Sequence, residues 1–382
     1  MMSDDGSLAK RLAEALEDEL PAAIELRHLL HADPRLSGDE ADTAGTVVAA
    51  LNFGAGTEVA GTGRIVRVGG GGPAVALRAE LDALPIVETS DVPWSSRGAA
   101  MHACGHDVHL AAIVAAVRAI HACGLPVAAI LQPREEGAPS GAHDVVDSGA
   151  LLSFDITAVI GAHVQPRLAA GTMAVTPGLV NASVDEFEIV MHGRVGHAGY
   201  PHTIVDPVVG LAATIVNLQQ IPARRVDPVA GAVCMVTEVH AGTSTNVVPA
   251  EARARGTLRL MRDADRSAMA VALTSIVEHT AAAYGCTASV RIVDGEPSLR
   301  NDSGLAAATA ELLTAGGYPL VTDFRSFGAD DFAYYCRAVP CLMIFVGVEG
   351  PGLHDPLFVP SDDAIRTVAH ALLAGYVAAL AR

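Results

Sequence analysis

The sequence predicts an α/β protein in which a mostly parallel sheet is interrupted by a smaller inserted domain. Two observations support this prediction. Strands alternate with helices before residue 180 and again after residue 294, whereas the segment between them follows the order β-α-β-β-α-β. Because 382 residues exceed what one core usually supports, we assign residues 1–180 and 294–382 to the main domain. Residues 181–293 then form a ferredoxin-like insertion.

The composition narrows the class of protein. Apolar residues make up 51% of the chain and charged residues 18%, as in a well-packed globular protein. A net charge of −18 without a basic stripe argues against a nucleic-acid partner. The most apolar stretches, residues 110–131 and 364–380, are interrupted by Arg, His or Pro, so we expect no membrane span. The start of the chain does not resemble a signal peptide, and the six cysteines lack paired spacing, so we expect a cytoplasmic protein without a disulfide framework.

The elements of the main domain follow from hydrophobic periodicity. We expect helices at 8–31, 38–51, 110–120, 304–315 and 330–337 and at the C-terminus, and strands at 65–68, 74–77, 127–131, 159–162 and 341–346. The glycine run at 69–72 lacks the Lys-Ser/Thr of a phosphate loop and leads into a strand, so we interpret it as a turn. In the insertion we expect strands at 183–191, 231–239, 251–260 and 287–293 and helices at 207–218 and 266–283.

The segment MHACGHDVH, residues 101–109, contains three histidines, a cysteine and an aspartate just before a predicted buried helix. On this interpretation Cys104 and His106 lie in the loop that leads into the helix, and Asp107 is its N-cap. A thiolate and an imidazole two residues apart can reach one metal ion or a metal pair. The alternative is a buried structural cysteine surrounded by solvated histidines.

Further metal-type side chains follow predicted strands or lie in loops: Glu135, Glu136, His163 and His354. Each alone is weak evidence, since single histidines and adjacent glutamates usually face solvent. Glu135 and Glu136 follow a buried strand, however, and consecutive side chains of a strand point in opposite directions. One could then bind a metal while the other faces an attacking water, which is the arrangement that a metallohydrolase needs.

Six segments of the chain form one ordered set of motifs: LRAELDALPI (77–86), MHACGHD (101–107), QPREEG (132–137), GAH (161–163), GHAGYPH (196–202) and LHDP (353–356). Together they resemble the M20 metallopeptidase family, in its aminoacylase-like branch of hippurate hydrolases, N-acyl-amino-acid amidohydrolases and auxin-conjugate hydrolases. The chain departs from the family pattern at Arg35, where Glu is usual, and at residues 329–331, where Ala-Asp-Asp replaces Ser-Glu-Asp.

The resemblance implies two divalent metal ions (Zn, Mn, Co or Ni) in the main domain, which would be the catalytic domain. It implies Glu135 as the general base, Cys104 as the bridging ligand and Asp82 as a residue that orients the site; the implied metal ligands are Cys104, His106, Glu136, His163 and His354. The inserted domain would be a dimerisation lid. In it, His197 would reach the oxyanion position of the partner subunit, and Asn246, Arg259 and His202 would contact the substrate. From the residues alone, Asn246 could simply belong to a turn and Arg259 to a surface ion pair.

The sequence thus predicts a homodimeric two-metal amidohydrolase that cleaves N-acyl amino acids or short peptides. A dipeptidase or general amidase of the same fold is an alternative. An HD-type phosphohydrolase, suggested by His106-Asp107, would require an all-helical fold. A binding protein that kept the fold but lost the chemistry is disfavoured because Glu135 stands intact beside Glu136.

Overall fold

The computed structural model describes residues 2–382, with side chains from Ser7 onward. The chain divides into two compact units. Unit 1 comprises Met1–Gly178, Arg300–Arg325 and Asp330–Arg382, and unit 2 comprises Leu179–Leu299 and Ser326–Ala329. None of the helices in the described residues is long and apolar enough to cross a membrane. All six cysteines are free.

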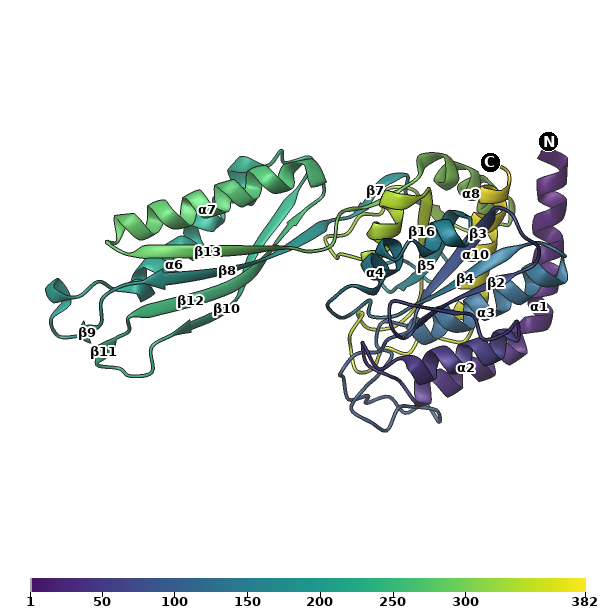
Figure 1. Cartoon of the computed structure of the whole chain (residues 1–382), viewed down its shortest axis with the longest axis horizontal. Helices are drawn as coiled ribbons and strands as arrows, with labels where there is room; N and C mark the ends of the chain where they lie inside the picture. Colours follow the sequence, from purple (N-terminus) through teal and green to yellow (C-terminus); the bar gives the residue numbers. More distant parts are fainter. Residues whose placement is uncertain (1) are drawn as a thin grey trace. The chain divides into compact units, whose positions relative to one another are not determined.

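Unit 1 is built on an eight-stranded sheet with the order β1-β2-β4-β3-β5-β16-β6-β15 (Figure 1). Its central strands β4, β3, β5 and β16 run parallel, so the predicted α/β class with a mostly parallel sheet is confirmed. The strands are β1 Thr57–Val59, β2 Gly63–Val68, β3 Ala74–Glu80, β4 Val127–Gln132, β5 Ile156–Gln165, β6 Met173–Ala174, β15 Leu320–Val321 and β16 Cys341–Gly347.

Helices cover both faces of this sheet. On one face α3 and α10 pack against each other and against the central strands, with α1 lying over both; on the other face α4, α5 and α9 contact β4, β5 and β16. Every residue of β3 and β4 is buried, as expected for parallel strands between two helical layers. The helices are α1 Met2–Ala32, α2 Ala41–Leu51, α3 His106–Ala122, α4 Gly141–Asp147, α5 Ala150–Ser153, α8 Ser303–Ala315, η4 Asp331–Tyr334, α9 Tyr335–Ala338 and α10 Asp363–Leu380.

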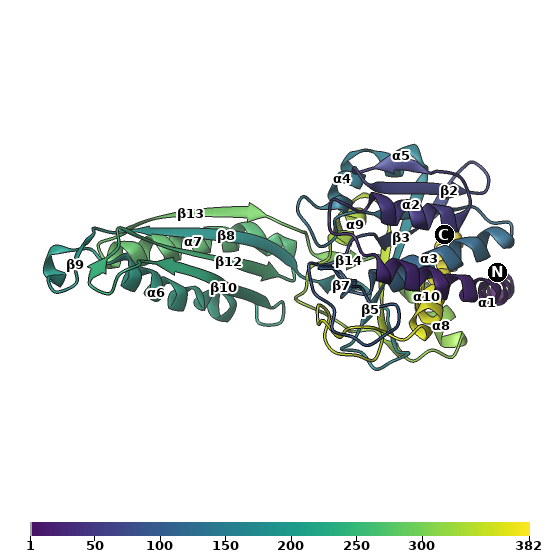
Figure 2. The ribbon, with the colours of Figure 1, turned by 90° about the horizontal axis from the view of Figure 1, so that it is seen from below.

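Unit 2 holds a four-stranded antiparallel sheet with the order β10-β12-β8-β13. Its helices α6 and α7 contact each other and the sheet, so they share one face (Figure 2). Along β12 the side chains alternate strictly: Ala252, Ala254, Leu258 and Leu260 are buried against the helices. The elements are β8 Ser183–His192, α6 Pro207–Leu218, η2 Ile221–Arg225, β10 Ala232–Ala241, β12 Glu251–Leu260, η3 Asp263–Asp265, α7 Arg266–Ala283 and β13 Thr287–Asp294.

Short elements complete the chain. In unit 2, the two-stranded ribbon of β9 and β11 lies beside η1. Strand β7 pairs with β14. Their bounds are β7 Gly178–Asn181, β9 Gly196–His197, η1 Pro201–Thr203, β11 Val247–Val248 and β14 Leu299–Asn301.

Two local predictions are wrong. Asp107 is not the N-cap of α3, because the helix begins at His106 and its N-cap is Gly105, with φ 82°. The predicted helix at 330–337 is instead η4 followed by α9, and Asp330 caps η4 by accepting a hydrogen bond from the Phe332 N–H at 2.9 Å. In both cases the aspartate binds a partner that periodicity does not reveal.

Asp107 lies in a buried charge cluster. Its Oδ2 is 2.9 Å from Arg27 Nε and 2.9 Å from His31 Nδ1. Arg27 also reaches Asp362 Oδ1 at 2.6 Å and stacks over Trp94, with 4.3 Å between Cζ and the ring centroid. Burial alone would raise the pKa of Asp107, but Arg27 and His31 hold that pKa well below its usual range. The cluster therefore joins α1 to the first turn of α3.

Replacing Asp107 by Asn should lower the free energy of unfolding by about 3–5 kcal/mol at pH 7, because buried cationic partners lose their counter-charge. A carboxyl group whose pKa is lower in the folded state than in the unfolded state stabilises the folded protein at pH values above its unfolded-state pKa, about 3.9. This stabilisation is lost as the pH falls through the folded-state pKa. Asp107 also raises the pKa of its partner His31, so protonated His31 stabilises the wild-type fold below its unfolded pKa of about 6.5. The deficit should therefore be larger at pH 5 than at pH 7. Urea unfolding measures it, with Asp39→Asn as the control at an exposed carboxylate. A loss of less than 1 kcal/mol in the free energy of unfolding would show that the cluster contributes little to stability.

Candidate active site

The five predicted metal ligands come together at the carboxyl edge of the parallel strands. His163 lies near the end of β5, Glu136 follows β4, and His354 follows β16. Cys104 lies in the loop before α3, as predicted, whereas His106 is the first residue of that helix and not part of the loop. The Cys104 Sγ is 3.5 Å from His163 Nε2, and His354 Nε2 is 3.2 Å from Glu136 Oε1. This is the edge at which open α/β sheets place their binding sites.

The hydrogen bonds of two histidines determine which ring nitrogen faces the cluster. His106 Nδ1 lies 2.8 Å from the carbonyl oxygen of Asp82, and His163 Nδ1 lies 2.7 Å from that of Val164. A carbonyl oxygen only accepts, so each Nδ1 carries the hydrogen and each Nε2 presents a lone pair. His106 Nε2 is buried and has no hydrogen-bond partner. Both imidazoles are thus oriented as metal-binding imidazoles are, with the second nitrogen anchored.

Close backbone packing holds the Cys104 loop. A Cβ on Gly105 would lie 2.5 Å from Val164 Cγ2, and the positive φ there favours glycine. The N–H of His354 donates to the Ala103 carbonyl at 2.9 Å, so the loop after β16 docks on the Cys104 loop. His354 itself has φ 66°, a conformation that is uncommon for a non-glycine residue and found at functional sites.

The Glu135-Glu136 pair lies beyond the end of β4, so the prediction that strand geometry turns the two side chains in opposite directions is wrong. A left-handed residue, Arg134 with φ 50°, bends the chain after the strand. Carboxylate oxygens of both glutamates lie within 4.8 Å of a His106 ring nitrogen. Asp82 supports the pair, since its Oδ2 accepts from the Glu136 N–H at 2.9 Å.

Charge repulsion and burial act differently on the two glutamates. Burial and the neighbouring carboxylates, Glu136 first among them, raise the pKa of Glu135 well above its usual range. Burial would also raise the pKa of Glu136, but its contact with His354 and the proximity of His106 lower that pKa. Burial and the same two carboxylates raise the pKa of the Cys104 thiol. The site therefore concentrates negative charge that a cation would stabilise.

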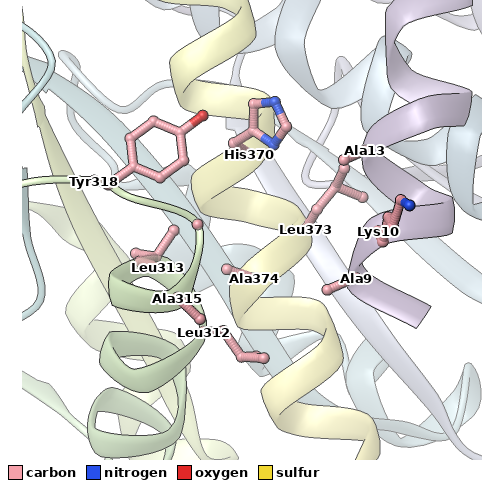
Figure 3. A pocket seen from close by; sticks show the side chains of 11 residues that line it. Ala9, Lys10, Ala13, Leu312, Leu313, Ala315, Tyr318, His370, Leu373 and Ala374 are labelled. Carbon is pink, nitrogen blue, oxygen red and sulfur yellow. The ribbon is translucent and has the colours of Figure 1, made fainter. Parts of the chain in front are cut away.

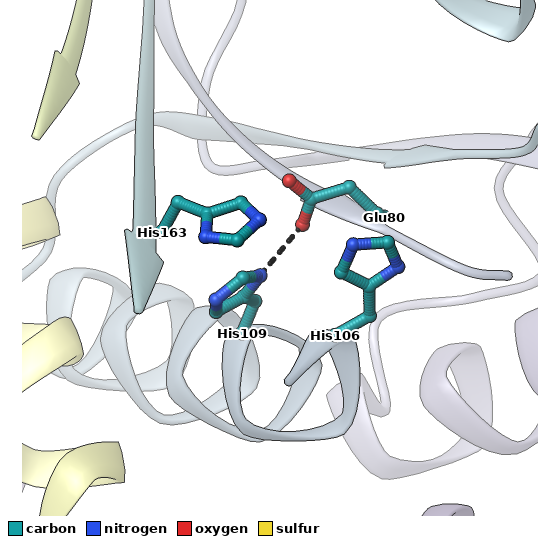
Figure 4. Close-up of side chains that lie close together, drawn as sticks. All are labelled: Glu80, His106, His109 and His163. Carbon is teal, nitrogen blue, oxygen red and sulfur yellow. Dashed lines mark hydrogen bonds and ion pairs between the residues drawn. The ribbon is translucent and has the colours of Figure 1, made fainter. Parts of the chain in front are cut away.

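The sequence predicted no role in the site for Glu80 and His109, yet both lie beside the predicted ligands (Figure 4). Their donor atoms and those of His106 and His163 lie within 4.8 Å of one another. His109 Nε2 accepts from the Val164 N–H at 3.0 Å, so its Nδ1–H donates to Glu80 Oε2 at 2.9 Å. With both nitrogens occupied, His109 orients the site rather than binding metal. The sequence shows that His109 belongs to the segment 101–109, but it does not show the contacts of His109 with Glu80 and Val164.

The other predicted site residues lie in unit 2 and fall into two places. His197 pairs with Val247 across β9 and β11, and the Ala198 N–H donates to the Asn246 carbonyl at 3.0 Å. His202 follows in η1. Arg259 lies in β12, eight residues after the first residue of that strand, which corresponds to roughly 27 Å of extended chain. Its guanidinium donates to the Phe327 carbonyl at 2.8 Å. The structure brings His197 near Asn246 but not near Arg259.

A pocket of about 440 Å³ between α1, α8 and α10 is separate from the site (Figure 3). Its walls are mainly apolar, with Lys10, Tyr318 and His370 as polar groups. Burial lowers the pKa of His370, and Lys10 Nζ lies 3.8 Å from Glu14 in an exposed ion pair. The pocket contains no carboxylate, thiol or imidazole pair, so it lacks the groups that hydrolysis would use.

The fold and the donor set define a hydrolase of the metal-dependent type, and comparisons with known proteins agree. The sequence profile of peptidase family M20/M25/M40 matches residues 76–374. The chain is 35% identical over 365 residues to an N-acetylcysteine deacetylase of Bacillus subtilis, covering 91% of this chain and 93% of that protein. It is 34% identical over 296 residues to an N-acetyldiaminopimelate deacetylase of Shouchella clausii, covering 76% and 79%.

A crystal structure described as a dinuclear metal-binding peptidase of the M20 family from Bacillus subtilis is also similar. It superposes with a TM-score of 0.82 at 32% identity, covering 95% of this chain and 99% of that one. The chain therefore belongs to the M20/M25/M40 peptidase family. The predicted resemblance and the predicted class, a metal-dependent hydrolase of amide bonds, are confirmed.

Replacing Cys104 by Ala should reduce the metal content and the activity together, because the cluster loses the thiol that lies nearest to His163. The measurement is metal stoichiometry by mass spectrometry after dialysis, followed by hydrolysis with excess metal. Cys123→Ala, at a free cysteine outside the site, is the matched control. Full metal content and normal turnover in Cys104→Ala would remove this residue from the site.

Proposed function

We propose that this protein is a two-metal amidohydrolase that removes the acyl group from N-acyl amino acids. The proposal rests on one observation above all: two imidazole lone pairs, a thiol and a carboxylate converge on one cluster beside a further glutamate. The names of the deacetylase relatives support an N-acyl amino acid as the substrate. Short peptides are the second candidate, because the similar Bacillus structure is described as a peptidase.

The residues fit a pair of divalent cations. The buried His106 Nε2 has no hydrogen-bond partner, and Glu136 lies within reach of both His106 and the Cys104–His354 group. Cys104, His106, Glu136, His163 and His354 would hold the metals. A thiolate with imidazoles and one carboxylate suits Zn, Co or Ni, and Mn fits the oxygen ligand.

Glu135 performs the proton transfers in this proposal. When bound, the metals would polarise the scissile carbonyl and lower the pKa of the attacking water. Glu135 accepts a proton from that water and returns it to the leaving amine. Asp82 keeps His106 and Glu136 in place, through its carbonyl oxygen and its carboxylate respectively.

The inserted domain supplies substrate contacts in a homodimer. His197 would stabilise the oxyanion, and Asn246, His202 and Arg259 would bind the substrate, with Arg259 pairing with its carboxylate. Because roughly 27 Å of β12 separate Arg259 from the end that carries Asn246, one small substrate cannot contact both within one chain. We therefore propose that His197 and Asn246 act in the site of the partner subunit.

Glu135→Gln should retain its metals and lose turnover by roughly 10²–10⁴-fold, since the amide cannot accept the proton. The test is a panel of N-acetyl, N-benzoyl and dipeptide substrates, each as the free acid and as the C-terminal amide, with Zn, Mn, Co or Ni supplied. Glu136→Gln is the comparison and should lose metal as well as rate. Undiminished hydrolysis by Glu135→Gln would exclude it as the base, and equal rates on acids and amides would reject the carboxylate anchor.

Heterodimers test the contribution of the partner subunit. Glu135→Gln and His197→Ala homodimers should each be nearly inactive. In a co-expressed heterodimer, the His197→Ala chain keeps Glu135 and receives His197 from its partner, so one site is complete. Activity per heterodimer should return to about half that of the wild type, measured after purification on two affinity tags. Verified heterodimers without activity would show that His197 does not act in trans.

A further inference from the structure

Glu135, the proposed base, and Glu136, a proposed metal ligand, lie in a loop, residues 133–140, whose ends meet. The N–H of Gly141 donates to the Arg134 carbonyl at 3.1 Å. A Cβ on Gly141 would lie 1.7 Å from the Pro133 carbonyl oxygen, so only glycine allows this approach. At the start of the loop Arg134 adopts φ 50°, which costs a non-glycine residue of the order of 1 kcal/mol. Such a conformation persists only where the surroundings hold it.

A buried carboxylate outside the metal-ligand set holds this strained residue. Glu40 is fully buried. Its Oε1 accepts from the Arg134 N–H at 2.9 Å and from the Gly38 N–H at 2.8 Å. Its Oε2 accepts from the Thr62 hydroxyl at 2.6 Å. One side chain thus joins three separate segments at the residue that directly precedes Glu135.

The segment that Glu40 anchors also touches the other end of the glutamate pair. Ser37 Oγ donates to Asp82 Oδ2 at 2.6 Å, and a Cβ on Gly137 would lie 2.6 Å from Ser37 Cβ. Residues 37–40 therefore line the Glu135-Glu136 turn from Arg134 to Gly137. The three donors to Glu40 are two backbone N–H groups and a hydroxyl, all of them neutral. The Glu40 carboxylate therefore acts through the geometry of its hydrogen bonds and not by pairing with a positive charge.

We propose that Glu40 is a positioning residue for hydrolysis: by accepting from the Arg134 N–H it fixes the backbone turn that points Glu135 at the reacting water. This inference rests on the proposed function of Glu135. A misplacement of about 1 Å in a reacting group can cost about 10²-fold in rate. Loss of Glu40 should therefore lower kcat about 10–100-fold at saturating metal and leave KM within about threefold.

Two substitutions at this position separate hydrogen bonding from charge. Glu40→Gln keeps an oxygen for both N–H donors and turns its amide toward Thr62 Oγ, which can accept, so kcat should stay within about threefold of wild type. Glu40→Ala removes all three contacts. Tyr376→Phe is the control, since it removes a hydrogen bond of 2.7 Å to the Pro126 carbonyl at the opposite end of β4. It should leave kcat unchanged within twofold.

A second measurement is independent of activity. Amide hydrogen exchange of the peptide that covers residues 133–140 should accelerate about tenfold or more in Glu40→Ala, and it should match the wild type in Glu40→Gln and Tyr376→Phe. If Glu40→Ala does not fold, Glu40→Asp replaces it: the shorter side chain cannot reach Arg134, and the same losses are expected.

The outcomes are distinct. A lower kcat with faster exchange in this loop, both restored by Gln, supports the proposal. A kcat within twofold of wild type, a lower kcat without faster exchange, or a failure of Gln to restore kcat each overturns it. If the wild-type protein hydrolyses none of the acyl amino acids or peptides, the proposed function fails instead, and the exchange rates still decide whether Glu40 holds the loop.

Discussion

The site depends on a positive charge buried beneath it, the guanidinium of Arg78 in the central strand β3. A buried guanidinium is costly unless its donors are paired, and here Glu80, Asp331 and Gln132 accept from it. Through Glu80 the network reaches His109, whose Nε2 accepts from the Val164 N–H beside His163. Arg78 thus helps to fix the position of His109 and of the backbone beside His163.

The other branch of the network reaches the glutamate loop. Asp331 accepts from Gln132 Nε2 at 2.8 Å, before the loop, and from the Ser140 hydroxyl at 2.7 Å, at its end. It also accepts from the Ala142 N–H at 3.1 Å. Because Arg78 donates to both Glu80 and Asp331, the two halves of the site are joined through one guanidinium. Side chains outside the predicted ligand set thereby determine where the predicted ligands lie.

The two departures from the family pattern have different consequences. Arg35 lies within 3.0 Å of both Asp33 and Asp42, in partly exposed ion pairs of little energetic weight. In the Ala-Asp-Asp segment, Asp331 keeps the contacts of the network, whereas Asp330 caps η4 and lies beside Glu135. The carboxylate at position 330 contributes to the raised pKa of Glu135. A change outside the predicted ligand set can therefore still influence the proposed base.

The sequence by itself determined the elements and the metal-ligand candidates. Periodicity placed β12 and α7 at their observed bounds, because each has one buried face along its whole length. The motif at 101–107 marked Cys104 and His106, since few other patterns combine these donors so densely. The order of strands and helices was sufficient to predict the α/β class.

Only the tertiary structure decided how the donors are oriented and what holds them. The Nδ1 bonds of His106 and His163 involve carbonyl oxygens whose positions depend on strand ends, which periodicity does not specify. Asp107 looked like a helix cap, yet it binds Arg27, which is 80 residues away. Glu40 fell within the helix predicted at 38–51, but it precedes α2, and its side chain is buried against Arg134. Such long-range contacts arise because parallel strands bring their carboxyl ends to one edge, whatever the separation along the chain.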